Sequence, residues 1–125
     1  MSFAALSKEQ FINLATTKKS GTSVATPVWF VHDGDVLYVM TGKDAGKVKR
    51  IRNYPVVTLG PCDRTGNPLG PTQTGTARLL DESEFPRVNG LLNSKYGFMK
   101  RVFDLMARFN GGVQNRAFIE IRPGA

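Results

Sequence analysis

The chain has 125 residues and a mass of 13.7 kDa, the size of one ordinary domain with its own hydrophobic core. Hydrophobic residues make up 41% of the sequence and charged residues 22%, a composition that excludes a disordered polypeptide. Lys and Arg outnumber Asp and Glu by 17 to 10, and the net charge of +7 indicates an anionic partner such as nucleic acid, a membrane surface or a phosphorylated ligand.

Six segments have the alternating pattern and the β-branched or aromatic content of β-strands. In the first of them, Ile12, Leu14 and Thr16 fall on one face. The Asp33-Gly34 pair is a strong signal for a hairpin turn between the second and third segments. In chain order, the predicted strands are residues 11–18, 23–32, 36–41, 56–61, 72–80 and 116–122.

Short helices complete the prediction. Apolar residues at helical spacing predict a helix over residues 44–53, a second that begins at Asp81, and a third stripe over residues 99–109. Tyr96, near the junction of the last two, is expected at the surface. Because hairpins join most strands and no βαβ alternation occurs, we predict a mainly β (α+β) fold, an antiparallel barrel of about six strands. We expect residues 1–125 to form this one domain.

Composition argues against several kinds of site. A lone cysteine, Cys62, cannot form an intramolecular disulfide, and with one histidine, His32, it supplies too few ligands for an ordinary structural zinc site. We therefore predict no metal. No signal-peptide pattern begins the sequence, and no uncharged stretch, residues 20–32 included, reaches the roughly 18–20 apolar residues of a membrane span. We expect a cytoplasmic protein without a membrane span.

The positive charge is concentrated near the middle of the chain. Net charge is zero over residues 1–42, +4 over 43–77 and +3 over 78–125. The middle excess lies mostly around the start of the predicted helix 44–53, where the helix dipole disfavours each cation by about 0.3–1 kcal/mol. A bound phosphate or polycarboxylate makes the same arrangement favourable, and Gly46 permits close approach to the backbone. Charge alone leaves a solvated basic helix face as an equal alternative.

Several motifs then occur in a characteristic order. VATPVWF over residues 24–30 is followed by LYVMT over residues 37–41 and by GKVKRIRN over residues 46–53. GTARL at residues 75–79 and IEIRP at residues 119–123 complete the pattern. In this order and spacing the chain resembles the pyridoxamine-phosphate-oxidase-like split β-barrel superfamily. More narrowly, it resembles the flavin/deazaflavin oxidoreductase B branch, a group named for dependence on coenzyme F420.

The resemblance implies a homodimer with a cofactor groove at the subunit interface. It implies that the strand from Ala25 onward lies along a tricyclic ring, that Thr41 lies on the phosphate side and that Lys47 binds the phosphate. Further cations would contact the phosphate or the oligoglutamate tail of F420. It indicates no catalytic side chain. The implied cofactor-binding residues are Ala25, Thr26, Pro27, Val28, Trp29, Thr41, Ala45, Gly46, Lys47, Lys49 and Arg52.

One departure from the family pattern bears on the choice of cofactor. In flavin-binding relatives a Ser and an Arg commonly precede the lysine, and here those places hold Ala45 and Gly46. We therefore expect an oxidoreductase that transfers a hydride from reduced F420 to an unsaturated organic substrate, rather than a tight FMN binder. An FMN-dependent oxidoreductase, or a cofactor-binding or storage protein without turnover, is the alternative. A nucleic-acid-binding barrel is more remote, because no aromatic residue lies within residues 43–53.

Overall fold

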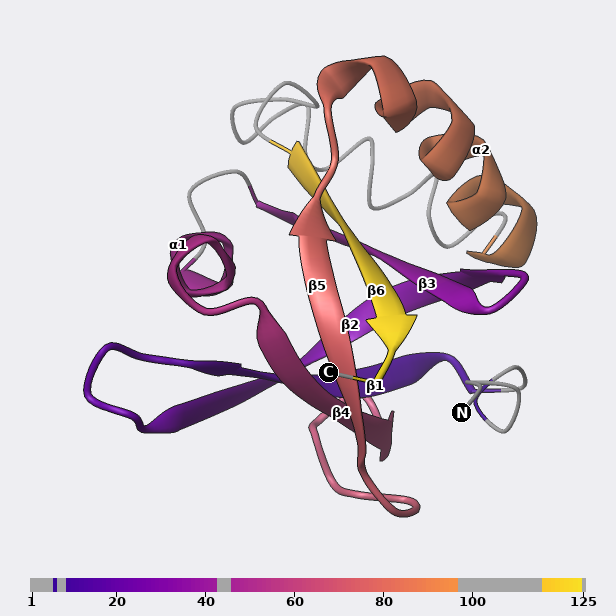
Figure 1. Ribbon diagram of the computed structural model, residues 1–125. Helices are drawn as coiled ribbons and strands as arrows, with labels where there is room; N and C mark the ends of the chain where they lie inside the picture. Colours follow the sequence, from indigo (N-terminus) through magenta and orange to yellow (C-terminus); the bar gives the residue numbers. More distant parts are fainter. Residues whose placement is uncertain (1–5, 7–8, 43–45, 97–115, 125) are drawn as a thin grey trace.

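The computed structural model describes residues 6, 9–42, 46–96 and 116–124 and forms a closed barrel of six antiparallel strands (Figure 1). Neighbouring strands follow the order β1-β2-β3-β6-β5-β4, and β4 pairs with β1 to close the ring. The predicted mainly β fold is confirmed, with strand ends within a residue or so of the expected ones. The strands are β1 (Phe11–Thr17), β2 (Ser23–Asp33), β3 (Val36–Gly42), β4 (Val56–Cys62), β5 (Gln73–Leu79) and β6 (Arg116–Pro123).

In the described part of the chain, two helices lie on different sides of this barrel (Figure 1). The short helix α1 (Gly46–Asn53) connects β3 to β4, and α2 (Phe85–Tyr96) follows β5 after a single 3-10 turn, η2 (Glu82–Glu84). The predicted stripe over residues 99–109 lies outside the described residues. Among the described helices, none is both long and apolar enough to cross a membrane.

The barrel interior is filled by the inward-facing side chains of the strands. In β1 the alternation expected from the sequence is confirmed, because Ile12, Leu14 and Thr16 are each 0% exposed. Leu37 and Val39 of β3 are equally buried. Full burial of one such side chain contributes about 1.5–3 kcal/mol to folding. The same core also contains Leu6, Val28, Phe30, Ile51, Val57, Leu59, Ala77, Ile119 and Ile121.

Helix α2 covers the outer face of the sheet with a second apolar cluster. Val88, Leu92 and Tyr96 of this helix are all buried. Phe118 of β6 lies in this cluster, and its ring meets that of Phe85 edge-on at a centroid distance of 4.8 Å. From Phe118 to Ile121, β6 is therefore buried on both faces.

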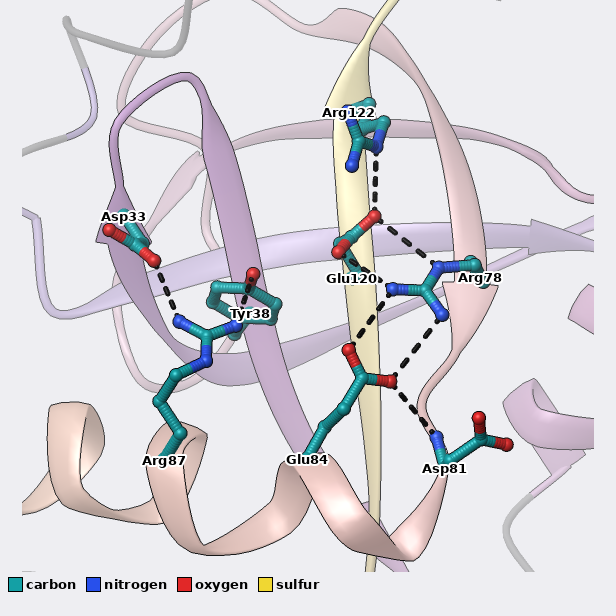
Figure 2. A network of polar contacts seen from close by, with 8 residues as sticks. All are labelled: Asp33, Tyr38, Arg78, Asp81, Glu84, Arg87, Glu120 and Arg122. Atoms are coloured by element: carbon teal, nitrogen blue, oxygen red, sulfur yellow. Dashed lines mark hydrogen bonds and ion pairs between the residues drawn. The ribbon is translucent and has the colours of Figure 1, made fainter.

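A polar network fixes η2 and α2 to the sheet (Figure 2). Glu120 on the outer face of β6 is only 4% exposed and accepts hydrogen bonds from Arg78 and Arg122, both at 2.9 Å. Arg78 also pairs with Glu84 of η2 at 3.4 Å. Burial opposes ionisation of Glu120, but the two arginines outweigh it and hold the pKa of this carboxyl below its usual value.

A second contact of the same kind holds the body of α2 against β3 (Figure 2). The guanidinium of Arg87 donates to the Asp33 carboxylate and to the Tyr38 hydroxyl, both at 2.8 Å. It also lies 5.1 Å from the centre of the Tyr38 ring, in cation–π contact. Because Asp33 and Arg87 are about half exposed, this ion pair positions the helix more than it stabilises the fold.

The strands β2 and β3 pair over only part of their length. In the described residues their register runs from Asp33 opposite Val36 to Phe30 opposite Val39. The rest of β2 pairs with β1, and the end of β3 pairs with β6. The barrel is therefore closed at one end of the β2–β3 pair and split at the other.

Replacement of Glu120 by Gln is expected to lower the free energy of unfolding at pH 7 by about 1–2 kcal/mol, because the buried charge-assisted hydrogen bonds are lost. A carboxyl with a depressed pKa in the fold stabilises it above the unfolded pKa of about 4.3, and this contribution disappears as the pH falls through the lower, folded value. The variant should therefore lose less stability than the wild type on acidification below about pH 4–5.

Urea unfolding of wild type and variant at several pH values measures the free energy of unfolding and its dependence on pH. Glu82→Gln, at an exposed position in η2, is the control; equal acid sensitivity of wild type and Glu120→Gln contradicts the prediction.

Candidate functional site

A cavity of about 260 Å³ lies where β2 and β3 separate. Most of its wall is apolar, from a stretch of β2, the start of β1 and the end of β3. One edge is polar, formed by a hydroxyl of β3 and an ammonium group of α1. The lining residues are Phe11, Pro27, Val28, Trp29, Met40, Thr41 and Lys47.

The backbone of β2 beside the split is bonded on the β1 side. The N–H of Phe30 is bonded to the Tyr96 hydroxyl at 2.9 Å, and that hydroxyl also lies 2.7 Å from the carbonyl oxygen of Gln10, which precedes β1. The backbone groups of Phe30 therefore face β1. Backbone groups alternate along a strand, so the nitrogen of Pro27 faces β3. Proline has no N–H to donate, which makes Pro27 suited to a place where no ladder continues.

Tyr96 also shapes the apolar wall. Its ring stacks on that of Trp29 with a centroid distance of 4.7 Å and an interplanar angle of 16°. The Tyr96 side chain is 9% exposed, and burial raises the pKa of its phenol to about 12. The expectation that Tyr96 lies at the surface is wrong, because the chain of α2 turns this residue inward against β2. One aromatic ring thus holds another in the cavity wall.

The polar edge of the cavity is cationic. Lys47 donates a hydrogen bond to the Thr41 hydroxyl at 3.3 Å and is partly buried. Burial, and then the nearby charge of Arg50, lower the pKa of the Lys47 ammonium from its usual value. Within the described part of the chain, neither Lys47 nor Arg50 has a carboxylate partner. The edge therefore carries positive charge that an anionic group could neutralise.

The basic residues of helix α1 do not all lie at its start, where the sequence predicted them. It begins at Gly46 in the described residues, so Lys47 and Lys49 are in its first turn, whereas Arg50 and Arg52 lie in its last turn, where the dipole favours cations. The unfavourable placement expected from the sequence therefore applies to the two lysines and not to Arg50.

The structure gathers about half of the predicted cofactor residues around the cavity. Five of them line it: Pro27, Val28, Trp29, Thr41 and Lys47. Phe11 and Met40 line it too and were not predicted, although Met40 lies in the LYVMT motif next to Thr41.

The other predicted residues lie elsewhere. Ala25 and Thr26 lie in β2 just before Pro27, outside the cavity lining. The buried Thr26 hydroxyl has no hydrogen-bond partner in the described structure. Lys49 is exposed on α1, and Arg52 lines a separate cavity of about 160 Å³ beside β5 and β6. Gly46 directly precedes Lys47 at the start of α1, and Ala45 lies outside the described residues.

Comparison with known proteins agrees with this architecture. Residues 3–125 match the sequence model described as pyridoxamine 5'-phosphate oxidase. A search of curated proteins found no significant match.

Solved structures with the same fold carry several different functions. A candidate pyridoxamine 5'-phosphate oxidase from Listeria innocua is 22% identical, with a TM-score of 0.68 over 98% of this chain and 90% of its own. An F420 reductase is 21% identical, with a TM-score of 0.59 over 99% of this chain and 94% of its own. A heme storage protein from Vibrio cholerae is 16% identical, with a TM-score of 0.70 over 94% and 84%. At these identities the likeness shows the shared fold alone.

Replacement of Tyr96 by Phe is expected to lower the free energy of unfolding by about 1–2 kcal/mol, because the buried N–H of Phe30 loses its acceptor. In the wild type the folded phenol has a pKa of about 12 against about 10 unfolded, so its protonated form favours the fold and this contribution is lost as the pH rises from about 10 to 12. Tyr96→Phe has no phenol at this position, so it should not lose this stability as the pH rises. Urea unfolding followed by the fluorescence of Trp29, the one tryptophan, measures both effects. Tyr54→Phe, at a residue 49% exposed, is the control; an unchanged alkaline profile in Tyr96→Phe contradicts the assignment.

Proposed function

Because the chain belongs to the pyridoxamine 5'-phosphate oxidase family, we propose that it is an oxidoreductase that binds coenzyme F420 and transfers a hydride from its reduced form to an unsaturated organic substrate. The observation that supports this most is the cavity at the β2–β3 split, which combines an aromatic wall with a cationic edge that has no carboxylate partner in the described chain.

The residues present fit a flat ring that carries an anionic side chain. Trp29 and Phe11 offer aromatic surface, and Met40 adds a polarisable, adaptable contact. At the other edge, Lys47 and Thr41 offer an ammonium and a hydroxyl at the distance of one hydrogen bond from each other. This separation of apolar and cationic groups within one cavity is what a phosphate-bearing ring cofactor requires.

Two observations favour F420 over FMN. Ala45 stands where flavin-binding relatives commonly carry a Ser hydroxyl before the lysine. The cationic excess around α1 suits a cofactor with an oligoglutamate tail, and Lys49 and Arg52 are the residues that we assign to that tail. The F420 reductase of the same fold is consistent with this choice.

The bound coenzyme would supply the hydride, and the protein would bind, orient and shield it. Stacking on Tyr96 fixes the orientation of the Trp29 ring in the cavity wall. The positive charge of Lys47 can stabilise negative charge that develops on a bound molecule. We assign no proton donor, because the described cavity lining contains no carboxyl, imidazole or thiol group.

We propose that two copies of the chain form the working unit. Phe11, Trp29 and Met40 are only partly buried around the cavity, so one chain leaves an apolar wall exposed to water. A second copy over this wall would enclose a bound ring and exclude water from it.

An FMN-dependent enzyme or a cofactor store is the second candidate. The cavity lining would also accept a flavin, and a heme storage protein has the same fold at 16% identity. A protein that binds the cofactor but catalyses no reaction with it would be a cofactor store rather than an enzyme.

Titration of the purified protein with F420 and, separately, with FMN is the direct test. We expect F420 fluorescence to be quenched with saturation in the micromolar range or below, and FMN to bind at least tenfold more weakly, which is a difference of about 1.4 kcal/mol or more. Tighter binding of FMN would favour the second candidate. Saturation by neither cofactor would contradict both.

Replacement of Lys47 by Met should weaken F420 binding by about tenfold to hundredfold, because a hydrogen bond to a charged group contributes about 1.5–3 kcal/mol. Lys19→Met, at an exposed position in the turn after β1, removes the same charge and should change affinity less than twofold. Equal affinity of Lys47→Met and wild type would remove the role that we give to Lys47.

Sedimentation velocity tests the dimer. We expect a species of twice the chain mass of 13.7 kDa at concentrations that bind cofactor. A monomer that binds F420 with full affinity would show that one chain is sufficient.

A further inference from the structure

We infer that Arg50 is a second ligand for the anionic group at the cationic edge of the cavity, and that the missing side chain of Gly46 is what admits it there. The inference rests on the proposed function, because the anion is the phosphate of the bound cofactor. The motif identified Lys47 as the phosphate ligand and left Arg50 without a role.

The Arg50 side chain runs back toward the start of α1. Its Nε donates a hydrogen bond of 2.6 Å to the hydroxyl of Thr16, which is 0% exposed on the inner face of β1. A Cβ atom at Gly46 would lie 2.6 Å from Arg50 Nη1 and 3.3 Å from Cζ. The guanidinium therefore occupies the space that any side chain at position 46 would need.

This position places the Arg50 guanidinium beside Gly46, the residue next to Lys47 in the chain. In agreement, the charge of Arg50 is a cause, after burial, of the lowered pKa of Lys47. Both side chains are partly buried, and like charges that lose hydration repel each other more strongly than they do in water. Within the described residues no carboxylate offsets them. A phosphate group between them would turn this repulsion into two attractions.

The donors of Arg50 are suited to that ligand. Thr16 takes the Nε–H and fixes the plane of the guanidinium, and among the described residues the two Nη groups donate no hydrogen bond. A planar guanidinium with both Nη groups available can hold two phosphate oxygens at once, whereas Lys47 provides a single point charge. Thr16 is thus a positioning residue, and Arg50 contacts the anion.

Two substitutions test the inference through different atoms. Arg50→Met removes the charge and keeps an aliphatic stem. Gly46→Ala leaves Arg50 in the sequence but forces its guanidinium to move, since the atom in the way is the flexible end of a side chain. Alanine is also the better helix former, which offsets the weakened Arg50–Thr16 hydrogen bond, so the thermal midpoint of Gly46→Ala should change little. A loss of affinity without a loss of stability is the result expected of Gly46→Ala.

The readout compares ligands with and without a phosphate: FMN against riboflavin, and F420 against its phosphate-free deazaflavin ribitol core. Each variant should weaken binding of the phosphate-bearing member by about tenfold to hundredfold and leave the other within twofold. In the double variant the effects should not add, because both act on one guanidinium. The controls are Arg64→Met, at an exposed position in the loop after β4, and Gly90→Ala in α2, where a Cβ meets nothing within 4 Å.

The outcomes separate this inference from the proposed function. If phosphate-bearing ligands bind Arg50→Met as tightly as wild type, the inference is wrong while the function stands. If the wild type binds none of the four ligands, the proposed function fails, and inorganic phosphate then decides the inference. In that case the Arg50 Nε–H NMR signal should shift with added phosphate in the wild type and not in Gly46→Ala, at constant ionic strength set by chloride. No phosphate-dependent shift in the wild type overturns it.

Discussion

The separation of β2 from β3 at Phe30 is the constraint on which the rest of the site depends. A barrel in which these strands paired along their whole length would have no opening there. On the β2 side of the split, the N–H of Phe30 is held by Tyr96 on the β1 side of the strand, and Pro27, three residues earlier, has no N–H to offer β3. The cavity is therefore a consequence of where the hydrogen-bond ladder ends.

The helix α2 keeps that opening in place. It is fastened to the sheet at both ends, by the Glu84–Arg78–Glu120 network at its start and by the Tyr96 hydroxyl at its last residue. Between these points its apolar face packs on the outer side of β3 and β6. A surface helix would have been sufficient to cover the barrel, but a helix with buried polar anchors also fixes the Trp29 ring in the cavity wall.

The distribution of charge changed most between sequence and structure. As a linear pattern, the residues around Lys47 form one basic run, and Gly46 marks the loss of a guanidinium from the family motif. In space the run divides. Lys47 reaches Thr41 of β3 and Arg50 turns back toward the start of α1, whereas Arg52 lines a different cavity. The space left by Gly46 is filled by Arg50, so a guanidinium is present at this edge although it comes from a different place in the sequence.

The sequence by itself determined the strand order along the chain, the inward-facing residues of β1, the apolar stripe of α2 and the family. These follow from local periodicity, turn chemistry and short motifs, which depend only on neighbours in the chain. Only the tertiary structure decided that β6 is buried on both faces, that Tyr96 points inward and that Arg50 reaches Gly46. Each of these depends on a contact between segments brought together by folding, or on the direction in which a side chain is held, and no local pattern specifies either.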